Sequence, residues 1–178
     1  MSRLPAVLLV AMILVACAQS LSIRGENGAL VPLMGSTLVL HQDITIPPNR
    51  TRAYFQKGRQ VPSGTGEFEP FCQVEVKKLL DTPQTVMADT FTVTKVSWNA
   101  ETVVDAGLLR LAGVGIGGGI MDSSPISNVF RMWLHSDRQP DVLFLICGGA
   151  FDDPIRVRDP TLADIRGTFG DIATFNTP

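Results

Sequence analysis

The sequence predicts a mainly β fold, an antiparallel β-sandwich or partly open barrel of six to seven strands with one C-terminal helix. Apolar and polar residues alternate along several segments, which is the pattern of half-buried strands. A helical period occurs near the C-terminus, in TLADIRGTFG. Because no helical segments alternate with the strands, we do not expect a parallel α/β architecture.

The first predicted strand is STLVLHQDITI, residues 36–46, whose apolar residues share one face. Pro47, Pro48 and Asn49 supply a turn, and TRAYFQKGRQ, residues 51–60, is the expected return strand of a hairpin. Two further strands are predicted in FCQVEVKKL and DTFTVTKVSW, residues 71–79 and 89–98.

The last strands and the helix complete the domain. FRMWLHS (130–136) and DVLFLICGG (141–149) flank the turn SDRQPD, and the second is apolar on both faces, as expected of a central strand. Thr161 and Asp164 have capping-box spacing, and Gly170 follows as a C-cap. A short strand in IATF, residues 172–175, closes the predicted fold.

The N-terminus MSRLPAVLLVAMILVACAQS predicts export. Arg3 precedes an apolar run that is too short to span a hydrocarbon core of about 30 Å, which is typical of a removable signal peptide. The tetrad LVAC, ending at Cys17, resembles the lipobox of bacterial lipoproteins. That resemblance implies cleavage after Ala16, a diacylglycerol on the Cys17 sulfur, and acylation of the new amino group by a chain such as palmitate.

We therefore expect three parts: a signal peptide over 1–16, a lipidated tether over 17–35, and one β-rich domain over 36–178. Two or three acyl chains anchor a protein to a membrane without spanning it. The tether would be flexible, with a reach of roughly 25 Å. By resemblance to enterobacterial sorting, Ala18 in place of Asp favours the periplasmic face of the outer membrane.

The other two cysteines predict a disulfide. With Cys17 lipidated, Cys72 and Cys147 remain in an oxidising compartment, and an even remainder favours a bridge. Both cysteines share a face with apolar strand residues, so the bridge is expected in the core. The alternative is two separate buried thiols.

The charge balance argues against a nucleic-acid partner. The chain has 15 basic and 17 acidic residues, and 14 basic residues remain once Arg3 is removed with the signal. This balance supplies neither the basic footprint of a nucleic-acid-binding protein nor a polybasic patch for anionic lipids.

The glycine run RLAGVGIGGG, residues 110–119, contains the spacing of a dinucleotide-binding loop. Such a loop must open a helix, and Pro125 with its small polar neighbours prevents a helix of useful length. The run also lacks the Lys-Ser/Thr pair of a P-loop. We therefore expect a loop and no nucleotide or other cofactor.

Three other groups of residues carry weaker signals. His135, Ser136 and Asp137 have the residue types of a hydrolytic triad, but neighbours on a strand point to opposite faces, so a turn-capping role is expected. His41 and Asp43 with His135 lack zinc-site spacing, and no metal is expected. The acidic residues of the C-terminal part lack the ligand spacing of an EF-hand and are expected to be solvated and paired with Arg156, Arg158 and Arg166; they are Asp152, Asp153, Asp159 and Asp164.

Most of the mature chain resembles uncharacterised small envelope lipoproteins of proteobacteria, in STLVLHQDITIPPNRTRAYFQ, CQVEV and LHSDRQPDVLFLIC. Such proteins have no established activity, so the resemblance implies no catalytic residues. We expect a non-enzymatic envelope lipoprotein with a structural or accessory binding role and an envelope protein partner. Two alternatives stay open: a carrier of a small apolar ligand in the barrel interior, and an envelope hydrolase.

Overall fold

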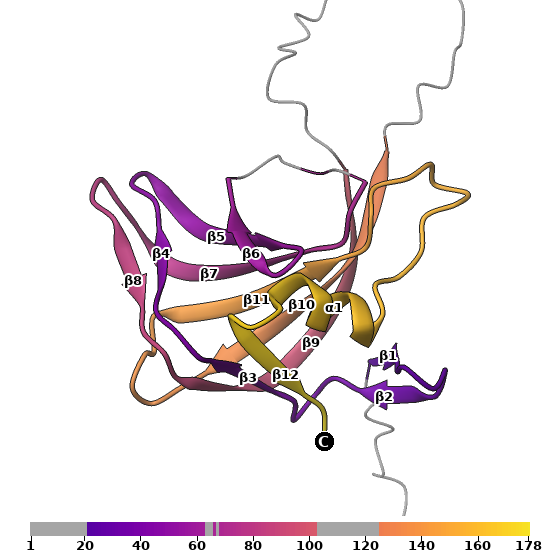
Figure 1. Cartoon of the computed structure of the whole chain (residues 1–178), viewed down its shortest axis with the longest axis horizontal. Coiled ribbons are helices and arrows are strands. Elements are labelled where there is room, and N and C mark those ends of the chain that lie inside the picture. The colour runs from indigo at the N-terminus through magenta and orange to yellow at the C-terminus, as the bar shows by residue number, and fades with distance from the viewer. Residues whose placement is uncertain (1–20, 63–65, 67, 103–124) are drawn as a thin grey trace, which may run out of the picture.

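The computed structural model describes residues 21–62, 66, 68–102 and 125–178. Within them, one antiparallel sheet of eight strands curls into a partly open barrel (Figure 1). Its strands, in spatial order, are β12 (Ala173–Asn176), β3 (Thr37–Leu40), β9 (Thr90–Thr102), β10 (Ile126–His135), β11 (Val142–Gly148), β7 (Phe71–Leu80), β5 (Arg50–Gln56) and β6 (Arg59–Val61). The predicted fold class is therefore confirmed.

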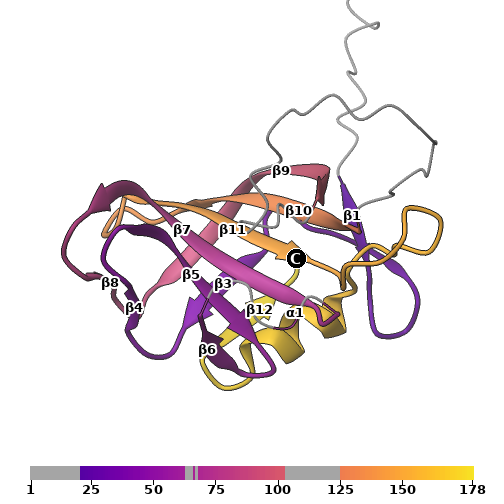
Figure 2. The same cartoon turned by 90° about the horizontal axis from the view of Figure 1, so that it is seen from above.

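Two short two-stranded ribbons lie at opposite ends of this sheet (Figures 1 and 2). One pairs β1 (Ser22–Arg24) with β2 (Leu30–Pro32), and the other pairs β4 (Ile44–Ile46) with β8 (Gln84–Val86). Both pack onto the core, because Ile23 of the first ribbon and Ile46 of the second are almost completely buried.

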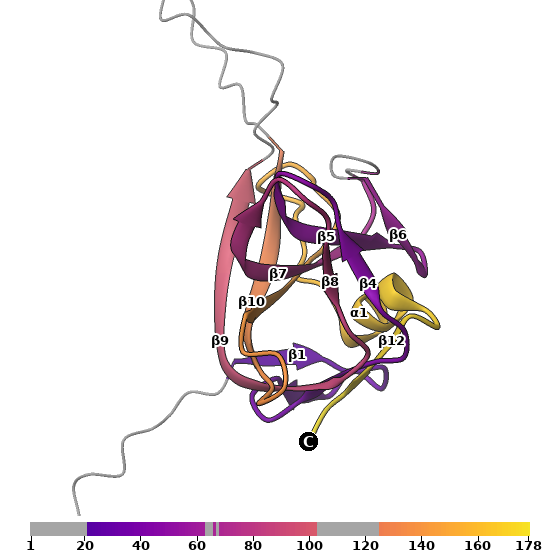
Figure 3. The same cartoon turned by 90° about the vertical axis from the view of Figure 1, so that its left-hand side faces the viewer.

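The single helix of the described residues, α1 (Leu162–Phe169), closes the barrel. In Figure 3 the strands form a ring that is open between β6 and β12, and α1 lies across this opening. Thr161 and Asp164 form the predicted capping box, and Gly170 is the C-cap with a positive φ of 54°. The buried face of α1 places Phe169 against Phe55 of β5, with ring centroids 5.1 Å apart.

The expected disulfide lies in the middle of the sheet. Cys72 and Cys147 are direct cross-strand partners on β7 and β11, and their sulfurs are bonded. Phe55 and Phe130 flank the bridge on the neighbouring strands, in register with it. Both cysteines are almost completely buried, so the bridge is part of the hydrophobic core.

Three predictions about local structure were wrong. Residues 36–46 form two strands, β3 and β4, because the chain bends at His41–Asp43 and enters a different sheet. Residues 51–60, predicted as one return strand, form a hairpin of β5 and β6 that turns at Lys57 and Gly58, which both have positive φ. The other edge of β5 pairs with β7 and not with the strand that precedes it in the chain.

The third error concerns the expected tether. The described part of residues 17–35, from Leu21 onward, contains the β1–β2 ribbon, and Leu33 is fully buried against the core. Residues 21–35 are therefore part of the folded domain. Asn27 and Gly28, at the turn between the two strands, carry a strong hairpin signal that could have located this ribbon.

A candidate binding cleft at one end of the barrel

A cleft of about 830 Å³ opens at the end of the barrel where β1 and β2 lie. Five parts of the chain line it: the β1–β2 ribbon, Phe68 and Pro70 before β7, Phe130 of β10, the segment 149–161 that leads into α1, and Asp164 in the first turn of α1. Figures 1 and 2 show this ribbon and this segment at the same end of the molecule. The volume is in the usual range of ligand sites, roughly 300–1,000 Å³.

The floor of the cleft is apolar and continuous with the core. Ile23 and Phe130 both line the cleft and are 1% and 3% exposed. Gly149 allows the chain to turn closely over this floor, because a Cβ there would lie 2.7 Å from the carbonyl oxygen of Arg158. The Ser127 hydroxyl donates to the Gly149 carbonyl at 2.9 Å.

Segment 149–161 is held in place at two more points. Asp152 and Ile126 exchange backbone hydrogen bonds of 2.9 and 3.0 Å, which tie the segment to the start of β10. Farther along, the indole Nε1 of Trp98 on β9 donates to Asp159 at 2.9 Å. The wall of the cleft is thus attached to the sheet on both sides.

The rim of the cleft exposes large apolar side chains. Leu30 and Phe68, which line the cleft, are 73% and 78% exposed. Ile155, between the lining residues Asp152 and Arg156, is 97% exposed. They are the three most exposed large apolar residues in the described part of the chain.

The charged side chains of the cleft differ in how they are engaged. Among the described residues, no carboxylate forms an ion pair with Arg24, Arg156 or Arg158. Each lining carboxylate instead accepts a hydrogen bond: Asp152 from the Asp153 N–H, Asp159 from Trp98, and Asp164 from Thr161. Within the described part of the chain, the three guanidinium groups of the cleft therefore have no carboxylate partner.

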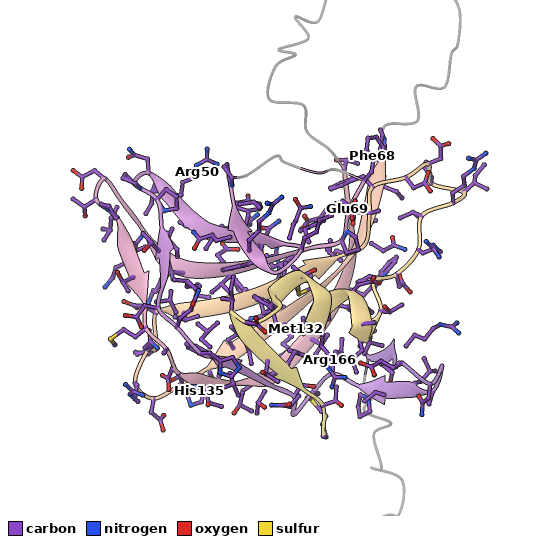
Figure 4. The ribbon with its side chains drawn as sticks, in the orientation of Figure 1. Arg50, Phe68, Glu69, Met132, His135 and Arg166 are labelled. Carbon is purple, nitrogen blue, oxygen red and sulfur yellow. A yellow bond between two sulfur atoms is a disulfide. The ribbon has the colours of Figure 1, made fainter. Side chains whose placement is uncertain are left out.

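The expected pairing of the C-terminal carboxylates with Arg156, Arg158 and Arg166 is not observed among the described residues, and Arg166 pairs elsewhere. This guanidinium donates to Glu26 in the β1–β2 turn at 2.7 Å and to the Phe175 carbonyl at 3.2 Å. Arg166 thus joins α1 and β12 to the β1–β2 ribbon, and Figure 4 shows it beside that ribbon.

The His135–Ser136–Asp137 group lies far from the cleft, at the turn between β10 and β11; Figure 4 shows His135 at the opposite end from Phe68. The His135 Nε2 contacts Asp137 at 3.2 Å, whereas the Ser136 hydroxyl donates to Asp89 at 2.7 Å and not to the histidine. The group caps this turn, and neither His135 nor Asp137 is hydrogen-bonded to the Ser136 hydroxyl.

Asp89 is the centre of that turn network. The hydrogen bond from Ser136 is the main cause that holds the pKa of Asp89 below its usual value. Burial opposes this effect, while Gln139, the Thr90 N–H and Arg138 lower the pKa further. The carboxylate accepts from Gln139 at 3.1 Å and from Arg138 at 3.3 Å. These contacts stabilise the ionised form in the folded protein.

The other residues weighed from the sequence are dispersed. His41 Nε2 lies 2.7 Å from the Thr174 hydroxyl, and Asp43 accepts from the Ala88 N–H. In the described ranges, no three His, Cys, Asp or Glu side chains gather in a way that could hold a metal ion. Cys17 and the glycine run lie outside the described residues.

The barrel interior next to the disulfide is occupied by side chains. Its largest fully buried residues are aromatic: Phe55, Phe91, Phe169 and Phe175. They belong to one cluster that also includes both cysteines and the buried face of α1.

The cleft was not predicted from the sequence, because its lining comes from segments far apart in the chain.

No family model, curated protein or solved structure matches the chain. Among the described residues, no helix has the length and apolar character needed to cross a membrane.

Proposed function

We propose that the chain is an exported lipoprotein, anchored through an acylated Cys17 at the periplasmic face of the outer membrane, with a non-enzymatic accessory binding role. The buried disulfide is the observation that carries this proposal. Cys72 and Cys147 are bonded to each other in the core, and such a disulfide is typical of a protein in an oxidising compartment. Cys17 is then the one cysteine left for acylation.

The binding role is supported by the cleft. Its apolar floor and three available guanidinium groups can hold a partner, whereas the histidines and Ser136 lie elsewhere and do not converge on a substrate position. The filled interior gives less support to a carrier of a small apolar ligand, which would need a cavity within the barrel. An envelope hydrolase has no serine–histidine contact among the described residues to support it.

The anchor is tested by mass spectrometry of the protein purified from its native membranes. We expect a mature chain that begins at Cys17 and carries acyl chains, with Cys72 and Cys147 resistant to alkylation until reductant and denaturant are added together. A Cys17→Ser chain should lose the acyl mass and leave the membrane fraction. An unacylated native N-terminus would refute the anchoring proposal.

The binding role is tested by capture from envelope fractions. A photoreactive residue at position 158, inside the cleft, should trap an envelope component. The matched control carries the same residue at position 174, which is exposed on β12 outside the cleft. Equal trapping at both positions would contradict a specific role for the cleft.

A further inference from the structure

We propose that the cleft end of the barrel docks on an anionic lipid surface, with Leu30, Phe68 and Ile155 entering the interface and Arg24, Arg156 and Arg158 contacting headgroups. This inference deepens the proposed function, on which it rests, by naming the partner of the same cleft. Three features support it: an exposed apolar rim, arginines beside that rim that have no ion-pair partner among the described residues, and the short stretch of chain between the proposed acylation site and the folded domain.

The apolar rim is the first observation. Leu30, Phe68 and Ile155 come from three separate segments, yet all three lie at one end of the barrel, on the cleft or in the segment that lines it. Large apolar side chains that gather while exposed mark a surface meant for a partner or a membrane. Aromatic and aliphatic residues enter the headgroup and acyl boundary of a bilayer.

The arginines are the second observation. Arg24 is the direct cross-strand partner of Leu30, and Arg156 follows Ile155, so each of these cations stands beside an apolar rim residue. Among the described residues none of the three cleft arginines has an ion-pair partner. Each basic residue near an anionic bilayer contributes about 1 kcal/mol. The sequence predicted no basic patch, because these residues become neighbours through folding.

The start of the folded domain is the third observation. Ser22 of β1 lines the cleft, and the proposed acylation site, Cys17, precedes Leu21 by four residues. Even a fully extended chain of four residues reaches no farther than about 14 Å. An acylated Cys17 would therefore hold this end of the barrel near the bilayer. The β4–β8 end, on the far side of the molecule, would face away (Figure 1).

The test uses the full chain with Cys17→Ser, which binds vesicles through the folded surface and not through acyl chains. Cosedimentation is measured with vesicles of phosphatidylglycerol mixed equally with phosphatidylcholine, and with phosphatidylcholine alone. We expect binding to the anionic vesicles that weakens as NaCl rises. Arg156→Gln with Arg158→Gln should weaken it about 25-fold, at about fivefold for each arginine. Phe68→Ser and Ile155→Ser should each weaken it about tenfold or more.

Two matched controls distinguish docking through the cleft from nonspecific binding of the protein surface to vesicles. Arg59→Gln removes an exposed arginine of β6, and Leu79→Ser removes an apolar residue of β7 that is 65% exposed; both lie outside the cleft and should change binding less than about twofold. The substituted positions in the described residues are all exposed, and urea denaturation confirms that each variant is folded.

Several outcomes would overturn the inference: no binding to anionic vesicles, equal binding to phosphatidylcholine alone, or an equal loss in the controls. A photoreactive residue at position 68 that traps a protein in native membranes, and no lipid, would also overturn it. Because the vesicle assay uses an unacylated chain, these failures would leave the acylation of Cys17 standing. Conversely, a native protein found to be unacylated would refute the proposed anchor, whereas an affinity measured with the Cys17→Ser chain would still support docking on anionic lipid.

Discussion

Gly58 and Gly170 lie backbone to backbone where α1 closes the barrel. A Cβ on Gly170 would lie 2.7 Å from the Gly58 Cα, and the Gly58 N–H donates to the Thr168 carbonyl at 3.0 Å. Gly170 has φ 54° and ψ −128°, which a residue with a side chain adopts only under strain. The closure between the β5–β6 turn and the end of α1 therefore depends on both glycines.

Replacement of Gly170 should open this closure. We expect Gly170→Ala to lower the free energy of unfolding by about 2–3 kcal/mol, because the methyl group adds a backbone clash to an unfavourable conformation. The control is Gly167→Ala, within α1, where a Cβ meets nothing within 4 Å. That change should be neutral or stabilise by up to about 1 kcal/mol. Urea denaturation measures both; equal effects would show that the glycine contact does not matter.

Removal of the disulfide should cost more than any surface change. The bridge closes a loop of 75 residues, for which chain entropy predicts roughly 4 kcal/mol of stabilisation. We expect Cys72→Ala with Cys147→Ala to lower the free energy of unfolding by about that amount. Because both cysteines are buried, reductant alone should leave the folded wild-type bridge intact over the time of the assay. Rapid reduction without unfolding would contradict the core location.

Asp89 should make stability depend on pH in the acidic range. Its folded pKa lies below the usual 3.8, so the ionised carboxylate is stabilised by folding. This contribution is complete above the unfolded pKa and is lost as pH falls from about 3.8 through the lower folded pKa. Ser136→Ala should raise the Asp89 pKa toward 3.8, which NMR titration measures, and should flatten the acid limb of the stability curve. An unchanged pKa would contradict the role of the hydroxyl.

Asp141 offers a contrast at the surface. The hydrogen bond from Lys78 is the main cause that lowers the pKa of Asp141, and burial opposes it. Both side chains are more than half exposed, so salt should screen their attraction. We expect added NaCl to move the Asp141 pKa back toward its usual value more than the Asp89 pKa. Equal salt sensitivity would indicate that the Asp89 network is as solvated as this pair.

The Trp98–Asp159 hydrogen bond should keep segment 149–161 ordered. Asp159→Ala removes the acceptor of the indole N–H, and we expect faster amide exchange across this segment with little change in β7 and β11. Asp159→Asn keeps a carbonyl acceptor and should exchange nearly as slowly as the wild type. The protein has two tryptophans, so in a Trp133→Phe background the fluorescence reports Trp98 alone. If amide exchange in Asp159→Ala were as slow as in Asp159→Asn and the wild type, the hydrogen bond would not be what orders the segment.

Much of the fold could be predicted because its signals are local. Alternation located β7 and β10 together with their buried faces, and a run that is apolar on both faces located β11. The spacing of Thr161, Asp164 and Gly170 located both ends of α1. The cysteine pair was predicted because Cys72 and Cys147 lie at inward positions of two strands, given the expected acylation of Cys17. These features depend on neighbours within one strand or one helical turn.

The errors arose where tertiary structure decides. Leu40 and Ile44 would share one face of a single strand, and the polar run of residues 41–43 between them does not by itself reveal that the chain changes sheet there. Gly58 turns the chain within a segment whose composition resembles a single strand, and the turn signal Lys57–Gly58 is weaker than an Asn–Gly pair. The cleft combines Arg24 with Arg156, which no local pattern connects.

The position of β12 sets the order in which this molecule can be completed. The last strand lies beside β3, near the beginning of the domain, with Phe175 opposite Leu38. During synthesis from the N-terminus, β3 lacks this neighbouring strand until residues 173–176 have been made. The central strands and their bridge can assemble earlier, because every residue from 71 to 148 is already present. A chain cut short before residue 173 would therefore present β3 as a bare sheet edge, open to pairing with other chains.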